Sequence, residues 1–151
     1  MRRGSMMDAF DLNGFLPYRL AVAAQHVSRA FERRYAEVAG LSVPEWRVMA
    51  HLSQQQEVSV REIEARVDME KSKVSRAASR LEEQGLITKV VNPADRRLVS
   101  LSLTAEGRAV MARLIPIAVA FQEELRARLG AGAAGFEAGL AALRGGDDDP
   151  L

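Results

Sequence analysis

Basic and hydroxyl side chains are concentrated between residues 71 and 80, a stretch that contains no acid. The forked guanidinium of arginine can bind guanine O6 and N7 together, whereas lysine mainly neutralises phosphate. Short serines let a helix backbone approach a nucleic acid and donate to its bases or phosphates. This is the chemistry of duplex contact, and the candidate residues are Lys71, Ser72, Lys73, Ser75, Arg76, Ser79 and Arg80.

The spacing of these residues predicts a helix with one polar side. With Val74 facing inward and about 100° of rotation per residue, Ala78 and Leu81 fall on the same side as Val74. The opposite side then carries Ser72, Arg76 and Ser79. Any solvated helix can have such a polar side, so the helix alone leaves its partner open.

A predicted two-stranded hairpin follows this helix, with strands over residues 86–91 and 98–103. Asn92 and Pro93 end the first strand and shape the turn. Asp95 can accept hydrogen bonds from turn amides or from an arginine, which would hold the tip rigid. Arg96 or Arg97 could then reach into a narrow, A/T-rich minor groove. An ordinary polar turn is the alternative, but a helix directly followed by an arginine-tipped hairpin is typical of a winged helix-turn-helix.

The other elements are expected to be helices that position this pair. Apolar residues recur every three or four positions over residues 12–39, which predicts a long first helix that ends at Gly40. A second helix is expected to begin near residues 42–45, with its buried face formed by Trp46, Val48, Met49 and Leu52.

Three further helices complete the prediction. Ser59 is expected to cap a short third helix, with Glu62 completing a capping box. The basic helix follows and ends at Gly85, and Thr104 caps a long helix over residues 105–129 in which Pro116 should cause a kink. A last short helix is expected over residues 134–144.

Composition excludes several classes of function. The 151 residues carry a net charge of +1 and contain no cysteine, so disulfides, thiolate metal sites and cysteine catalysis are excluded. No apolar run reaches the roughly 20 residues that span a bilayer. The two histidines are expected on different helices, and the sequence has no phosphate-binding loop and no His-x-x-x-His pair or group of carboxylates arranged to make a metal site. We therefore expect no enzyme activity, cofactor, metal or membrane contact, and a cytoplasmic location, at the nucleoid when bound to DNA.

The predicted fold is mainly α with a small β-wing, a winged helix-turn-helix flanked by dimerisation helices. The flanking helices carry apolar stripes too long for a lone winged module to cover, and a second copy would cover them. Folding back onto their own module is the alternative. The expected organisation is an N-terminal tail over 1–11, whose first six residues need not be native, a dimerisation helix over 12–41, the winged module over 42–107, dimerisation helices over 108–144 and a disordered acidic tail over 145–151.

From about residue 16 to 121 the sequence resembles the MarR (multiple antibiotic resistance) family of transcriptional regulators. The strongest part is the wing pattern, an aspartate, one residue, an arginine, five residues, then Leu-Thr and a glycine. Residues 41–48, 73–76 and 81–86 are also similar to the family's second helix, its recognition helix and the exit from that helix. The wing pattern is formed here by Asp95, Arg97, Leu103, Thr104 and Gly107.

The resemblance implies a triangular homodimer that pairs through its first and last helices and binds a pseudo-palindromic DNA operator, usually as a repressor. It implies that Arg97 enters the minor groove with Asp95 as its positioning partner, that Arg76 is the principal base contact, and that Thr104 is structural. Activation in place of repression stays open, because it depends on where the operator lies.

The resemblance also implies release from DNA when a small molecule, often an aromatic carboxylate or phenol, binds between the dimer helices and the winged module. An arginine could pair with a carboxylate, a tryptophan could stack on a ring, and a histidine could give a pH-sensitive hydrogen bond. The candidates are Tyr18, Arg19, His26, Trp46 and His51. For Trp46 the alternative is a place in the core.

A winged-helix module that binds protein and not DNA is the alternative function. Such a module would be expected to carry apolar residues on the exposed side of its recognition helix. Here that side keeps Ser72, Arg76, Ser79 and Arg80. The sequence therefore favours DNA over a protein partner.

Overall fold

The computed structural model describes residues 9–67 and 69–144. The chain forms two compact units, which meet between Leu114 and Ile115 and are described separately. The predicted acidic tail over 145–151 and most of the predicted N-terminal tail lie outside the described residues. Within the described part of the chain, no helix is both long and apolar enough to cross a membrane.

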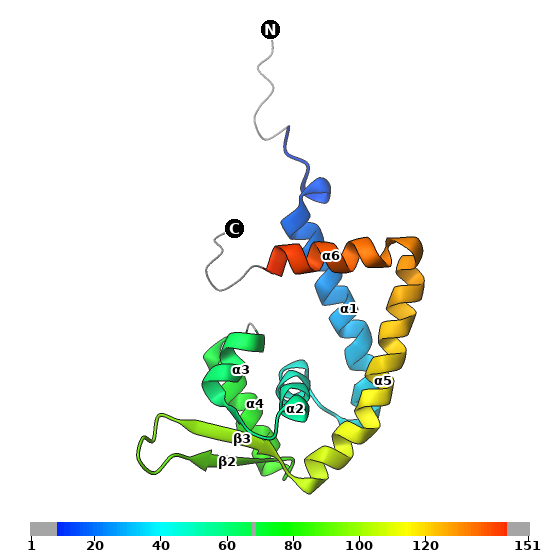
Figure 1. The fold of residues 1–151 in the computed structure, drawn as a ribbon. Helices are drawn as coiled ribbons and strands as arrows, with labels where there is room; N and C mark the ends of the chain where they lie inside the picture. The colour runs from blue at the N-terminus through cyan, green and yellow to red at the C-terminus, as the bar shows by residue number, and fades with distance from the viewer. Residues whose placement is uncertain (1–8, 68, 145–151) are drawn as a thin grey trace. The chain divides into compact units, whose positions relative to one another are not determined.

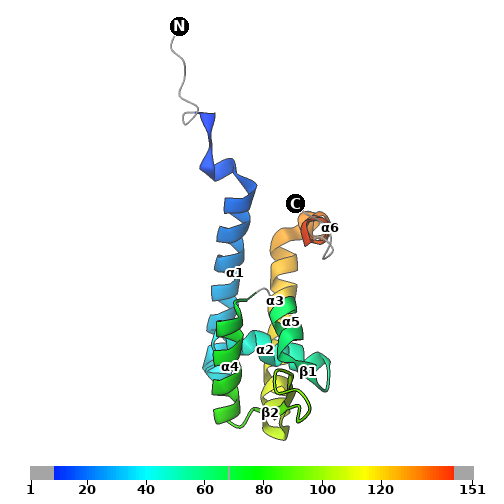
Figure 2. The same ribbon diagram turned by 90° about the vertical axis from the view of Figure 1, so that its left-hand side faces the viewer.

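The first unit begins with a short 3-10 turn, η2 (Leu12–Gly14), and a long helix, α1 (Leu16–Ala39). The sequence predicted one helix over both. The break lies at Phe15, whose backbone is extended. The C-terminal end is as predicted, because Gly40 adopts the left-handed conformation with φ of 63° and its N–H donates to the Ala36 carbonyl at 2.9 Å. In Figures 1 and 2, α1 extends well beyond the three helices that follow it in the first unit, α2, α3 and α4.

Three helices form the body of the winged module: α2 (Val43–Gln54), α3 (Val60–Val67) and α4 (Lys71–Glu83). A capping box between Ser42 and Glu45 starts α2, and the Ser59 hydroxyl accepts from the Glu62 N–H at 3.1 Å to start α3. The basic stretch forms α4, and Gly85 follows with φ of 73°. The predicted helices of the module are therefore confirmed.

The sheet has one strand more than predicted. Strands β2 (Ile87–Val91) and β3 (Val99–Leu103) form the expected antiparallel hairpin, and β1 (Val58–Ser59) pairs with the other edge of β3 in the order β1-β3-β2. A strand of two residues is too short for alternation to be visible in the sequence. The pairing of Val58 with Leu101 joins the wing to the start of α3. Figure 1 shows the hairpin projecting from α2, α3 and α4.

The core lies between the helices and the sheet of this module. Val74, Ala78 and Leu81 are buried, as the helical spacing predicts, and Ala77 is buried beside them. Val48, Met49 and Leu52 of α2 are buried as expected, whereas Trp46 is only half-buried. Other large core side chains are Tyr35, Val58, Ile63, Ile87, Leu101 and Leu114.

The last long helix, α5 (Ala105–Leu129), has the predicted bounds and begins in the first unit. Gly107 is packed so closely that an added Cβ would overlap the Leu86 carbonyl oxygen and lie 3.0 Å from its carbon. Arg113 donates to the Val38 carbonyl at 2.9 Å, which fixes the start of α5 to the end of α1.

The second unit contains the rest of α5, a 3-10 turn η3 (Gly130–Gly132) and α6 (Ala133–Arg144). Helix α5 continues through Pro116, and the kink expected there stays a prediction. Arg126 joins α5 to α6 through an ion pair with Glu137 at 3.0 Å. No residue of α6 is buried, so its apolar side chains have no cover in this unit.

Candidate nucleic-acid interface

Helix α4 presents most of its predicted candidates to solvent. Lys71, Ser72, Lys73, Ser75 and Arg76 are exposed, whereas Ser79 is half-buried. The Arg76 Nε donates to the Ser72 carbonyl one turn earlier, at 3.2 Å, which holds its stem against its own helix. The exposed part of α4 before Ser79 therefore carries three positive charges together with serine hydroxyls.

Arg80 differs from the other basic residues of α4. Its Nε lies 2.7 Å from Glu45 Oε1, and 51% of the Arg80 side chain is exposed against 6% for Glu45. The contact joins α4 to the N-terminal turn of α2. Sequence reasoning placed Arg80 among the DNA contacts and missed its partner, because the two residues are 35 positions apart.

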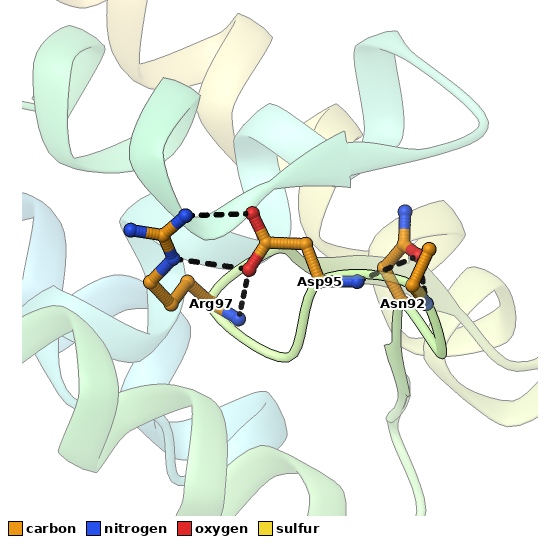
Figure 3. Close-up of polar contacts among 4 residues, drawn as sticks. Asn92, Asp95 and Arg97 are labelled. Atoms are coloured by element: carbon orange, nitrogen blue, oxygen red, sulfur yellow. Dashed lines mark hydrogen bonds and ion pairs between the residues drawn. The ribbon is translucent and has the colours of Figure 1, made fainter.

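The tip of the wing is held by a set of short-range hydrogen bonds. Asn92 Oδ1 accepts from the N–H groups of Ala94 at 2.8 Å and Asp95 at 3.3 Å. Asp95 in turn accepts from Arg97 three times, from its backbone N–H at 3.1 Å, its Nε at 3.0 Å and its Nη2 at 3.2 Å, as Figure 3 shows. Asp95 thus accepts hydrogen bonds from both a turn amide and an arginine, as the sequence predicted.

This arrangement orients Arg97 without covering it. The side chain of Arg97 is 81% exposed although its guanidinium is bound to Asp95 on one edge. The hydrogen bonds from Arg97 lower the pKa of the Asp95 carboxyl below its usual value, so Asp95 is ionised at neutral pH. Arg96, its neighbour, is also exposed. The tip therefore offers a pre-oriented arginine and a second arginine beside it.

The base of the wing is closed by Thr104. Its hydroxyl donates to the Gly85 carbonyl at 2.6 Å and accepts from the Gly107 N–H at 3.0 Å, and its backbone N–H donates to the Leu86 carbonyl at 3.0 Å. Thr104 thus caps α5, as predicted, and also fastens the end of α4. Together with the crowding at Gly107, this gives a physical reason for a Thr-x-x-Gly sequence after the wing.

The five candidates for small-molecule binding do not form one site within the chain. Trp46 belongs to an aromatic cluster, stacked on Tyr35 at 5.5 Å between ring centroids and edge-on to Phe31 at 5.1 Å. Tyr18, Arg19 and His26 are exposed on the N-terminal half of α1. Tyr18 precedes Tyr35 by about 25 Å of helix, at about 1.5 Å per residue. Trp46 is therefore half-buried within an aromatic cluster, and its role in effector binding stays a prediction.

Burial shifts the pKa of two groups, Tyr35 in this cluster and His51 on α2. Burial, with the nearby charge of Glu32 second, raises the pKa of Tyr35 to about 12, and the buried Tyr35 hydroxyl has no hydrogen-bond partner among the described residues. Burial, and then the charge of Arg66, lower the pKa of His51 from its usual 6.5. Tyr35 was part of the predicted apolar stripe but was not singled out as a candidate. Among the residues described, no group of acidic or histidine side chains could hold a metal ion.

Comparison with known proteins identifies this architecture. The model of the MarR family matches residues 39–98, which include α2, the helix-turn-helix and the first half of the wing. The transcriptional regulator HosA of Escherichia coli O111:H- is 34% identical over 94 residues, covering 62% of this chain and 69% of HosA. The chain belongs to the MarR family of transcriptional regulators. The expectation of a DNA-binding regulator and not an enzyme is therefore confirmed at the level of the family.

Two other MarR-type comparisons define how far the likeness extends. The HTH-type transcriptional repressor MdtR of Bacillus subtilis is 34% identical over 90 residues, which cover 52% of this chain and 58% of MdtR, so the match spans little more than half of that repressor. The solved structure of Bordetella bronchiseptica BpsR, whose DNA binding is regulated by 6-hydroxynicotinic acid, has a TM-score of 0.79 and 21% identity, covering 91% of this chain and 99% of that one. The winged fold with its flanking helices is thus shared.

Proposed function

We propose that this MarR-family chain acts as a homodimeric repressor that binds a pseudo-palindromic operator and leaves it when a small molecule binds. The observation that carries the proposal is the combination of an exposed basic side on α4 with a wing tip at which Asp95 orients the exposed Arg97. One element can enter the major groove while the other reaches the adjacent minor groove.

The two elements are assigned different tasks. Arg76 is the base contact in the major groove, because its fork can bind guanine and it lies exposed in the first turns of α4. Arg97 enters the minor groove, with Arg96 beside it, and Asp95 positions Arg97 without touching DNA. Five other polar residues of α4 are assigned to phosphate contacts: Lys71, Ser72, Lys73, Ser75 and Ser79.

The dimer is proposed from the exposed apolar residues of α1. Every described residue before Val27 is exposed, and Phe15, Leu16, Leu20 and Val22 are 45%, 63%, 36% and 49% exposed. Large apolar groups in contact with water along a helix favour association. A two-fold dimer would also present two copies of α4 to successive major grooves.

The effector is proposed to be a small aromatic anion. The observation in support is that BpsR, which shares the fold, has its DNA binding regulated by 6-hydroxynicotinic acid. In this chain, Tyr18, Arg19 and His26 lie on the part of α1 assigned to the dimer, and His51 lies on α2. These four residues offer a phenol, a cation and two imidazoles, and the dimer would have to bring them together.

Footprinting of the DNA upstream of the chain's own gene, over a salt series, tests this function. We expect a protected site with two-fold symmetry and about two helical turns in length. The affinity should fall with salt with a log–log slope of about −0.9 for each phosphate contacted. Equal affinity for every duplex, or a flat salt response, would contradict operator binding and favour a winged module that binds protein.

Substitutions then separate the two tasks. Arg76→Ala should lower operator affinity by about 1–3 kcal/mol and relax the preference at one base position. Arg97→Ala should weaken binding most where the flanks are A/T-rich. Asp95→Asn is the matched variant for the wing, because it keeps the size of the side chain while weakening its hold on Arg97. If Arg97→Ala lowers affinity equally for operators with A/T-rich and G/C-rich flanks, Arg97 does not have the minor-groove task.

A further inference from the structure

Glu45 is the one charged residue that is buried among those the structure describes, with 4% of its surface exposed. Both oxygens of its carboxylate are occupied. Oε2 accepts from the Ser42 N–H at 3.1 Å, which closes the capping box of α2, and Oε1 accepts from the Arg80 Nε at 2.7 Å. A single carboxylate therefore caps the start of α2 and also binds the recognition helix α4.

The geometry restricts how α4 can move. Helices α2 and α4 pack on one another, and the Glu45–Arg80 contact spans them at the C-terminal half of α4. Because Glu45 is fixed in the first turn of α2 by its capping bond, a rotation or slide of α4 would pull Arg80 away from Oε1. That would leave a buried carboxylate with one partner fewer, which is costly.

Arg76 offers a useful contrast on the same helix. Its Nε donates to the Ser72 carbonyl of α4 itself, so Arg76 moves with α4 and does not restrain it. Arg80 donates to a residue of a different helix, so its hydrogen bond forms only when α4 lies in this position relative to α2.

We propose that Glu45 and Arg80 form a brace that sets the orientation of the recognition helix. Arg80 is a positioning residue, which acts on operator binding through Glu45 and does not itself contact DNA. The inference rests on the proposed operator binding, and it changes the role that the sequence predicted for Arg80.

The test is a double-mutant cycle with Glu45→Gln, Arg80→Gln and the double variant. Lys73→Gln serves as the phosphate-contact control, and Glu83→Gln as an exposed acid on the same helix. Three quantities are measured for each: the midpoint of thermal unfolding, the ratio of operator to random-DNA affinity at a temperature where every variant is folded, and the slope of affinity against salt.

A brace predicts that either single variant lowers the operator-to-random ratio by about tenfold or more and keeps the wild-type salt slope. The double variant should lose less than the sum of the two single losses, in affinity and in unfolding midpoint, because two glutamines can bond each other and no buried charge is left alone. Lys73→Gln should reduce the slope by about 0.9 with the ratio little changed, and Glu83→Gln should resemble the wild type.

Several results would overturn the brace. A slope reduced by about 0.9 in Arg80→Gln, with Glu45→Gln binding normally, would make Arg80 a phosphate contact. A lower unfolding midpoint with an unchanged affinity ratio would mean that the pair serves stability alone, and additive effects would mean that the two residues do not act together. If the wild type itself shows no operator preference, the proposed function fails, whatever coupling the unfolding midpoints reveal.

Discussion

The winged module and the N-terminal half of α1 both carry apolar stripes, but among the described residues only those of the module are covered by other parts of the chain. Ile63, Val74, Leu81 and Leu101 are fully buried there, whereas Leu16 on α1 is 63% exposed. The module thus has a complete core in one copy of the chain. With the proposed dimer contact on α1, folding and association depend on separate segments, so substitutions in each should affect different measurements.

The largest effect is expected in the core of the module. Leu81→Ala removes a side chain that α4 buries completely, and such truncations destabilise by about 2–5 kcal/mol through lost burial and the cavity that remains. Urea unfolding would measure this loss. A free energy of unfolding close to that of the wild type would mean that the module does not depend on its own core.

Leu16→Glu is expected to act on association and leave folding almost unchanged. A carboxylate in an apolar dimer contact would raise the dimer dissociation constant by about a hundredfold, since desolvating a charge costs several kcal/mol. Sedimentation at several concentrations would measure it, with Gln56→Glu, at an exposed position between α2 and β1, as the control for added charge. A dimer of wild-type strength would place the association surface elsewhere.

Two glycines allow covered and uncovered parts of the chain to be compared by adding a single methyl group to each. Gly107 has no room for a Cβ, so Gly107→Ala should destabilise by about 1–3 kcal/mol as the backbone of Leu86 is displaced. Gly135 in α6 has nothing within 4 Å of the same atom, so Gly135→Ala should stabilise that helix by about 0.5–1 kcal/mol. Thermal unfolding should therefore shift in opposite directions, and shifts of the same sign would contradict the difference in packing.

The smallest effect is a pH dependence that originates in the module. The pKa of His51 is lowered in the folded state, by burial first and by Arg66 second, so the folded protein favours the neutral imidazole. The unfolded chain binds the proton more readily, and the stability contributed by neutral His51 is fully present above pH 6.5 and is lost as pH falls through the folded pKa. His51→Gln should reduce the change in the thermal unfolding midpoint between pH 7 and pH 5. If the midpoint of the variant changes with pH as much as that of the wild type, other groups cause the pH dependence.

Local patterns in the sequence were enough to predict most of the module. Helix caps at Ser59 and Thr104, the inward side of α4 and the contact between Asp95 and Arg97 all involve residues a few positions apart, and each has the geometry expected. These features depend on backbone geometry that repeats in every protein. The fold class could therefore be predicted before any comparison.

Contacts between distant segments could not be predicted in the same way. The partner of Arg80 on α2, the third strand that Val58 adds to the sheet, and the stacking of Trp46 on Tyr35 each depend on how helices pack after they form. Periodicity gives the side of a helix on which a residue lies, but not the residue that meets it.

The hydroxyl of Thr104 has a consequence for how this protein can diversify. The hydroxyl hydrogen-bonds both Gly85 and the first turn of α5. The two ends of the β2–β3 hairpin are therefore held close together at its base. Insertions, deletions or new residues around Asn92 would change what the wing reaches on DNA without altering the helices that carry it. If the proposed minor-groove contact holds, the preference for particular flanking DNA could therefore evolve at the tip, independently of the base contacts proposed for α4.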